Sequence, residues 1–198
     1  MIKCILFDLG GVVVDFWIKQ YFDYLGKVSG YSRKEVEKKL DYHWNMLELG
    51  LIHVKFFERE ISDVLGIERS KVQWIEFYKK NMRINKKMMA LVKALKKRYK
   101  VAFLSNVDHT KYDIGRSILD LKEFDYAFAS CYMKKRKPDP EAYKYVLRKM
   151  HMKADEVIFI DNQYENVLGA RSVGIKSIWF KGSKSELVRK LRKLGVEV

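Results

Sequence analysis

Apolar and polar positions follow two patterns from about residue 85 to the C-terminus. Short, continuous apolar runs predict buried strands, whereas apolar residues three or four positions apart predict helices that bury one face. The two patterns alternate, and the apolar runs are VAFLSN, FDYAFAS, VIFI and KSIWF. Continuous apolar strands that alternate with helices are typical of a parallel sheet covered on both faces.

The N-terminal run IKCILF has the same apolar character and predicts the first, central strand of this sheet. Its partner strands come only after residue 85, so the residues between are predicted to be an insertion. Within the insertion Val36, Leu40 and Leu47 follow helical spacing. Ser32 with Glu35 matches a capping box, in which two residues cap a helix N-terminus reciprocally.

These patterns predict an α/β protein with a three-layer, doubly wound, Rossmann-like parallel sheet and an inserted all-helical cap. The core domain is expected to span residues 1–15 and 85–198, and the cap residues 16–84. No strand is expected within the cap.

The composition fits a folded chain without a membrane segment. Of the 198 residues 48% are hydrophobic, enough for a sizeable core. No apolar run is long enough to span a membrane, and Asp8 interrupts the first one, so neither an anchor nor an export signal is expected. Cys4 and Cys131 both lie in strand-like runs, which favours buried free thiols in a reducing cytoplasm.

The chain carries 40 Lys and Arg against 25 Asp and Glu, a formal net charge of +15. A nucleic-acid-binding protein normally gathers such charge in a stripe or a motif. Here the charge is spread, with local runs at residues 134–137 and 184–193. We expect a small anionic substrate as partner, neither nucleic acid nor a membrane, and the oligomeric state stays open.

Polar side chains follow four of the predicted strands. They are Asp8, Ser105 with Asn106, the basic run that leads to Lys137, and Asp161 with Asn162. In an open parallel sheet, ligands bind beyond the carboxyl ends of the strands. A carboxylate, hydroxyl and amide groups and a lysine at this edge suit phosphoryl chemistry.

At these positions the chain resembles the haloacid dehalogenase-like hydrolases, over nearly its whole length and including a helical cap inserted after the first strand. Four motifs carry the resemblance, in order along the chain: FDLGGVVVD, LSN, KPDPEAY and FIDNQYEN.

The resemblance implies a nucleophile, Asp8, that forms a covalent aspartyl intermediate. Lys137 would offset negative charge, and Ser105 and Asn106 would donate to the phosphoryl oxygens. The remaining implied substrate-binding residues are Gly10, Gly11 and Asp15. A magnesium ion is implied, held by Asp8, Gly10, Asp161, Asn162 and Glu165.

The sequence departs from the phosphatases of this family at Gly10, where most have the aspartate that protonates the leaving group. One hypothesis is a substrate whose leaving group departs easily, such as an acyl phosphate or a sugar 1-phosphate. The other is that His43 or Asp15 donates the proton.

The predicted function is that of a magnesium-dependent phosphatase of a small phosphorylated metabolite, such as a sugar phosphate. Asn162 stands where phosphatases usually carry a carboxylate. It resembles the metal-independent 2-haloacid dehalogenases of the family, as do Lys137 and Tyr143. Gly10 and the lack of arginine between residues 15 and 30 argue against a dehalogenase. A catalytically weakened binding protein on the same fold is the third interpretation.

Overall fold

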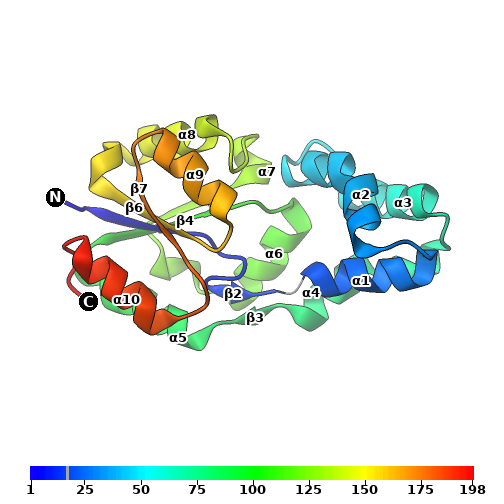
Figure 1. Cartoon of the computed structure of the whole chain (residues 1–198), viewed down its shortest axis with the longest axis horizontal. Coiled ribbons are helices and arrows are strands. Elements are labelled where there is room, and N and C mark those ends of the chain that lie inside the picture. Colours follow the sequence, from blue (N-terminus) through cyan, green and yellow to red (C-terminus); the bar gives the residue numbers. More distant parts are fainter. Residues whose placement is uncertain (17) are drawn as a thin grey trace.

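The computed structural model covers the 198-residue chain and describes residues 1–16 and 18–198. Its central sheet has five parallel strands in the order β5-β4-β1-β6-β7 (Figure 1). The strands are β1 (Cys4–Phe7), β4 (Lys100–Ser105), β5 (Tyr126–Ala129), β6 (Val157–Asp161) and β7 (Lys176–Trp179). The predicted doubly wound parallel sheet with β1 at its centre is confirmed.

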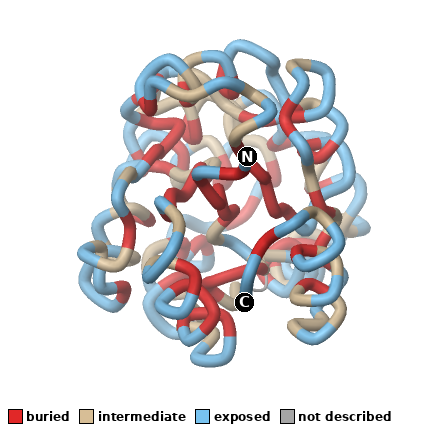
Figure 2. Tube along the Cα trace, turned by 90° about the vertical axis from the view of Figure 1, so that its left-hand side faces the viewer, coloured by how far each residue is buried: buried red, intermediate tan, exposed pale blue. Residues whose placement is uncertain are grey.

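Alternate residues of β1 face opposite layers of helices. Ile5 and Phe7 belong to the apolar cluster that includes α5 (Lys86–Lys96) and α10 (Lys184–Lys193). Cys4 and Leu6 belong to a second cluster with α8 (Pro140–Met150) and α9 (Tyr164–Ser172). Helix α6 (His109–Ile118) and the short α7 (Ser130–Met133) follow β4 and β5. Figure 2 shows the buried strands at the centre of the core, enclosed by more exposed helical segments.

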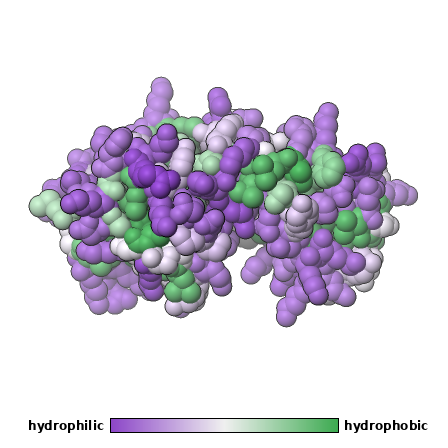
Figure 3. All heavy atoms as spheres, turned by 90° about the horizontal axis from the view of Figure 1, so that it is seen from above, coloured by the Kyte–Doolittle hydropathy of each residue, from purple (hydrophilic) through white to green (hydrophobic). Residues whose placement is uncertain are grey.

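Four helices lie together at one end of this core (Figure 1). They are α1 (Ile18–Ser29), α2 (Arg33–Glu48), α3 (Val54–Leu65) and α4 (Trp74–Asn81). They enclose a separate apolar cluster that includes Tyr21, Leu40, Phe57 and Trp74. The capping box of Ser32 with Glu35 is present at the start of α2. Seen from above, the molecule has two lobes with a notch between them (Figure 3).

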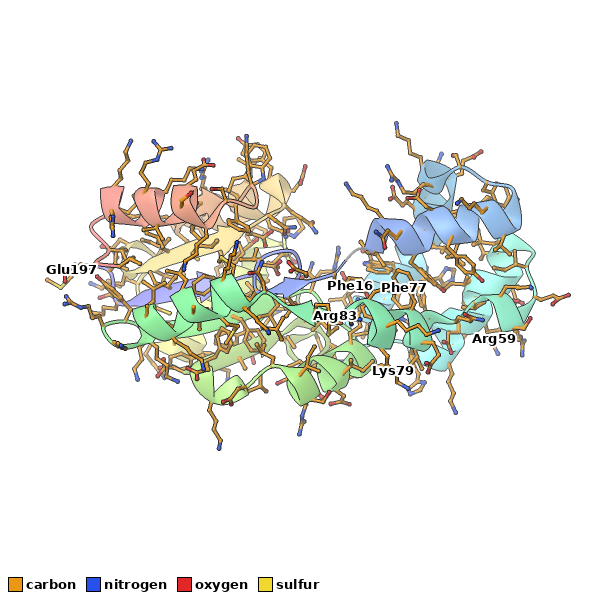
Figure 4. All side chains as sticks on the ribbon, turned by 90° about the horizontal axis from the view of Figure 1, so that it is seen from below. Phe16, Arg59, Phe77, Lys79, Arg83 and Glu197 are labelled. Carbon is orange, nitrogen blue, oxygen red and sulfur yellow. The ribbon has the colours of Figure 1, made fainter. Side chains whose placement is uncertain are left out.

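A two-stranded antiparallel ribbon joins the core to these helices. Strand β2 (Val14–Asp15) pairs with β3 (Arg83–Ile84). Phe16 follows β2 and stacks on Tyr78 of α4 with ring centroids 4.1 Å apart. Figure 4 shows Phe16, Phe77 and Arg83 gathered at this junction. The prediction of no strand in the inserted region is therefore wrong at its edge, since Arg83–Ile84 is too short to give a pattern.

A few smaller expectations also change. Both cysteines are buried and free, as predicted, but Cys131 lies in α7 and not in a strand. Short 3-10 helices occur at Arg69–Lys71, Leu121–Glu123 and Ala154–Glu156. No helix of the described part of the chain is long and apolar enough to cross a membrane.

Candidate active site

Asp8 lies directly after the central strand β1, and its backbone N–H donates to the Ile160 carbonyl of β6 at 2.8 Å. Its neighbours in the sheet are β4, which ends at Ser105, and β6, which ends at Asp161. Because parallel strands end at the same edge of a sheet, these three side chains meet there. Asp8 and Ser105 are each 6% exposed.

Lys137 brings the two carboxylates together. Its Nζ lies 2.6 Å from Asp8 Oδ1 and 2.7 Å from Asp161 Oδ2. Asn106 holds the lysine backbone on both sides: its Nδ2 donates to the Lys137 carbonyl at 2.8 Å, and its Oδ1 accepts from the Lys137 N–H at 2.9 Å. Asn106 therefore acts first as a positioning residue for Lys137, a role that the sequence did not indicate.

Asp161 is fully buried and held from three sides. Besides the lysine, Oδ2 accepts from Asn166 Nδ2 at 3.0 Å, and Oδ1 accepts from the Gln163 N–H at 2.7 Å. The Asn166 carbonyl in turn accepts from the Tyr143 hydroxyl at 2.7 Å. Asn166 was missed by the sequence analysis, and its position five residues after Asp161, early in α9, is the one available signal.

The buried site holds one ammonium between two carboxylates. Burial raises the pKa of Asp8 to about 7; Lys137 opposes this rise and Asp161 adds to it. Burial lowers the pKa of Lys137, but the charges of Asp161 and Asp8 outweigh it, so this pKa lies above its ordinary value. With both carboxylates ionised the trio carries one uncompensated negative charge, so the site favours a further cation.

The two glycines after Asp8 differ in their surroundings. Gly11 has φ +78°, and a Cβ there would lie 2.2 Å from Asn162 Nδ2. This position therefore requires glycine, both for its left-handed backbone and for the close approach of Asn162. A Cβ at Gly10 would meet only Asp8 Oδ2, at 4.0 Å. Space for a side chain thus exists at Gly10.

A cavity of about 310 Å³ lies over Asp8. Seven of the predicted site residues line it: Asp8, Gly10, Gly11, Ser105, Asn106, Lys137 and Asn162. Residues of the inserted region line it too: Phe16, Ile18, Phe22, Trp44, Glu48 and Tyr78. Lys111 and Arg136 complete its charged side chains among the described residues, and neither was singled out from the sequence.

Three predicted site residues do not line the cavity: Asp161, which is fully buried beneath it against Lys137, and Asp15 and Glu165, which lie elsewhere. Asp15 lies in the ribbon, where its Oδ1 accepts from Asn85 Nδ2 at 3.3 Å. Glu165 is exposed on α9. His43, the other suggested proton donor, lies 3.2 Å from Glu60 between two cap helices. Since neither His43 nor Asp15 is among the described residues that line the cavity, the structure does not support either as a proton donor.

The donor set for a divalent cation is small. Residues 1–16 and 18–198 contain no cluster of three or more His, Cys, Asp or Glu side chains placed to hold a metal ion. Magnesium, however, is usually held by one or two carboxylates and keeps several waters. Asp8 and Asp161, with their uncompensated charge, fit that requirement, and Gly10 and Asn162 line the cavity beside Asp8.

Comparisons with known proteins identify the family of the chain. A D-ribitol-5-phosphate phosphatase of Bacteroides thetaiotaomicron is 25% identical over 195 residues, 89% of this chain and 91% of that protein. A sesquiterpene phosphatase of Aspergillus oryzae is 28% identical, with 87% of each chain covered. The magnesium complex of a HAD family enzyme from B. thetaiotaomicron superposes with a TM-score of 0.80 and 26% identity, covering 95% of this chain and 98% of that one. Residues 2–174 match the haloacid dehalogenase-like hydrolases, and the chain therefore belongs to that family.

Proposed function

We propose that the protein is a magnesium-dependent phosphatase of a small phosphorylated metabolite, acting through an aspartyl-phosphate intermediate on Asp8. One observation carries the proposal: Asp8 lies at the end of the central strand, on a cavity of about 310 Å³, with Lys137 Nζ 2.6 Å from its Oδ1. The curated relatives named above are phosphatases, which supports the same reaction.

The two oxygens of the Asp8 carboxylate have different roles. Lys137 holds Oδ1, which leaves Oδ2, the oxygen nearest to Gly10, to attack phosphorus. As the Oδ2–P bond forms, the bond from phosphorus to the leaving-group oxygen breaks. Water then attacks the phosphorus of the aspartyl phosphate, the Oδ2–P bond breaks, and inorganic phosphate leaves the restored carboxylate. Lys137 offsets negative charge in both steps, and Ser105 lines the cavity within reach of a bound phosphoryl group.

Asp8 and Asp161 are the carboxylates that would hold magnesium, with the Gly10 carbonyl and Asn162 beside them. Three hydrogen bonds to Asp161 leave about one of its four lone-pair positions free, which suits a single bond to a metal. Bound there, the ion would supply the positive charge that lets a carboxylate approach a phosphate anion. Glu165, exposed on α9, is not needed for this set.

Phosphate release from a panel of phosphate esters, with magnesium and with a chelator, tests the function. We expect turnover that falls by at least about a hundredfold in chelator and returns when magnesium is added. A rate unaffected by chelation would contradict the proposed magnesium site. No turnover of any ester would contradict the phosphatase, and halide release from 2-haloacids would then identify a dehalogenase.

Gly11→Ala tests the close contact beside the nucleophile. The new Cβ, 2.2 Å from Asn162 Nδ2, forces that side chain to move by about 1 Å, and such a displacement can lower a rate by about a hundredfold. We expect kcat/KM for the best ester to fall by about ten- to a hundredfold.

Gly30→Ala is the matched control for this substitution. Gly30 also has a left-handed φ, +80°, but has open space around its Cβ position. Both variants should lose about 1–2 kcal/mol of stability from backbone strain, measured by urea unfolding. The control should keep the kcat/KM of the wild type, and an equal fall in both variants would show that the Asn162 contact does not matter.

A further inference from the structure

A second group of charged residues, two of them buried, lines the cavity that holds Asp8, apart from the proposed reaction centre. Lys111 comes from α6 of the core, and Glu48 is the last residue of cap helix α2. Each is 5% exposed. Arg136 lies in the loop after α7, and all three line the cavity. The reaction proposed above uses none of them.

The Lys111 ammonium is enclosed without a hydrogen bond. Its Nζ lies 4.5 Å from the Trp44 ring centroid and 5.0 Å from that of Tyr78. Its ion-pair partners are Asp108 Oδ2, at 3.4 Å, and Glu48 Oε1, at 4.0 Å. No side chain or backbone group of residues 1–16 and 18–198 accepts a hydrogen bond from Nζ. Because Lys111 lines the cavity and no hydrogen bond occupies its ammonium donors, they are available to a ligand.

One carboxylate oxygen of Glu48 is held by Arg136, and the other is available to accept a hydrogen bond from a ligand. Oε2 accepts from Arg136 Nε at 3.2 Å and from Nη2 at 2.8 Å. The Glu48 carbonyl accepts from Ser130 Oγ at 2.6 Å, which fixes this end of α2 on the core. Within the described residues Oε1 accepts no hydrogen bond and has only the ion pair with Lys111.

The 4.0 Å between Lys111 Nζ and Glu48 Oε1 is too long for a direct hydrogen bond. A single hydroxyl oxygen can lie about 2.8 Å from both atoms, accepting from the ammonium and donating to the carboxylate. A carboxylate or second phosphate would be repelled by Glu48, and an apolar group would leave Lys111 Nζ and Glu48 Oε1 without a hydrogen bond. The spacing therefore fits a group that accepts and donates at one atom, as a substrate hydroxyl does.

We infer that Lys111 and Glu48 together bind a hydroxyl of the leaving group, so that the substrate is the phosphate ester of a polyhydroxy compound, a polyol or a sugar. This inference rests on the proposed phosphatase function. The aromatic rings of Phe22, Trp44 and Tyr78 line the same cavity and offer apolar faces to the C–H groups of such a compound. A neighbouring, largely apolar cavity of about 100 Å³ is too small for an extended hydrocarbon.

The test compares two classes of ester by their kcat/KM. One is a polyol phosphate or sugar phosphate chosen from the panel, and the other is p-nitrophenyl phosphate, whose leaving group has no further hydroxyl. In Lys111→Met and in Glu48→Gln we expect the ratio of the first kcat/KM to the second to fall by about thirtyfold. A site built to bind a hydroxyl discriminates strongly against its absence, and losing one charged partner removes most of that preference.

Lys79→Met is the control, since Lys79, labelled in Figure 4, lies on α4 with an exposed side chain paired to Glu76. The control should keep the ratio of the wild type. If Lys111→Met does not fold because Asp108 loses its ion-pair partner, the result with Glu48→Gln tests the inference alone. The amide of this variant still faces Arg136, but it presents N–H groups to the substrate hydroxyl in place of a carboxylate oxygen.

Either of two results would overturn the inference. One is an unchanged ratio in the folded variants. The other is an equal loss on both esters, which would mean that the two residues only hold the cap against the core. If wild-type protein hydrolyses neither ester with magnesium present, the proposed function itself fails, and this result is distinguishable from the other two.

Discussion

Asp8→Asn is expected to lower kcat/KM for every ester by at least about ten thousandfold, because the amide cannot form an aspartyl phosphate. The fold should survive the change. Lys137 keeps its contact with Asp161, 2.7 Å away, so the buried ammonium retains a counter-ion. In chelator we expect the variant to melt no lower than the wild type, since the neutral amide removes the repulsion between two buried carboxylates. Phosphate release and thermal unfolding measure the two effects.

Asp113→Asn is the matched control, because Asp113 is 63% exposed on α6 and pairs only with Arg116 among its described neighbours. It should keep the activity of the wild type. Residual turnover of Asp8→Asn within a hundredfold of the wild type, with purity established, would show that a different group attacks phosphorus. If Asp8→Asn does not fold, Asp161 alone is not a sufficient counter-ion for the buried Lys137 ammonium.

The fold could be predicted because its signals are local and repeated. Each core strand is a continuous apolar run, and the order of runs and helices suffices to place β1 in the centre of the sheet. The ribbon of Val14–Asp15 with Arg83–Ile84 could not be predicted, since it depends on pairing between residues nearly 70 positions apart. The absence of a nucleic-acid partner remains a prediction, as do the domain boundaries.

In the site, the residues that follow core strands could be predicted from the sequence, whereas charged residues within helices could not. Asp8, Ser105 and Asp161 follow apolar runs, so their convergence follows from the parallel sheet. Glu48 and Lys111 are charged residues within amphipathic helices, where a polar residue is expected on the solvent face. Both are buried where the cap meets the core: Lys111 Nζ lies 4.5 Å from the Trp44 ring centroid, and the Glu48 carbonyl accepts from Ser130 Oγ. A pattern along one helix cannot report such a contact.

The carboxylates and the histidine that could replace the missing proton donor have other partners in the structure. Asp15 and His43 are engaged elsewhere, by Asn85 and Glu60 respectively. Glu48, the cap carboxylate in the cavity, is held by the Arg136 guanidinium. The hypothesis that remains is an easily departing leaving group, such as that of a sugar 1-phosphate. Of the two compound classes inferred above, it favours a sugar over a polyol, whose alkyl leaving group is poor. General acid catalysis contributes typically about a hundred- to ten-thousandfold, so its absence should show most with poor leaving groups.

Gly10→Asp should therefore restore the general acid that protonates the leaving group. The new Cβ would have only Asp8 Oδ2 within 4.0 Å, the backbone at Gly10 is not left-handed, and Gly10 lines the cavity, so a Cβ fits there without strain. We expect kcat/KM to rise by about a hundredfold for alkyl phosphates, whose leaving group is poor, and to change little for p-nitrophenyl phosphate. As the pKa of the leaving group rises, the kcat/KM of the wild type should fall steeply and that of Gly10→Asp only gently. Gly10→Asn, which has the same shape and no acidic proton, should keep the steep dependence. A gentle dependence in the wild type itself would mean that some group already protonates the leaving oxygen, and the easily departing substrate would no longer be required.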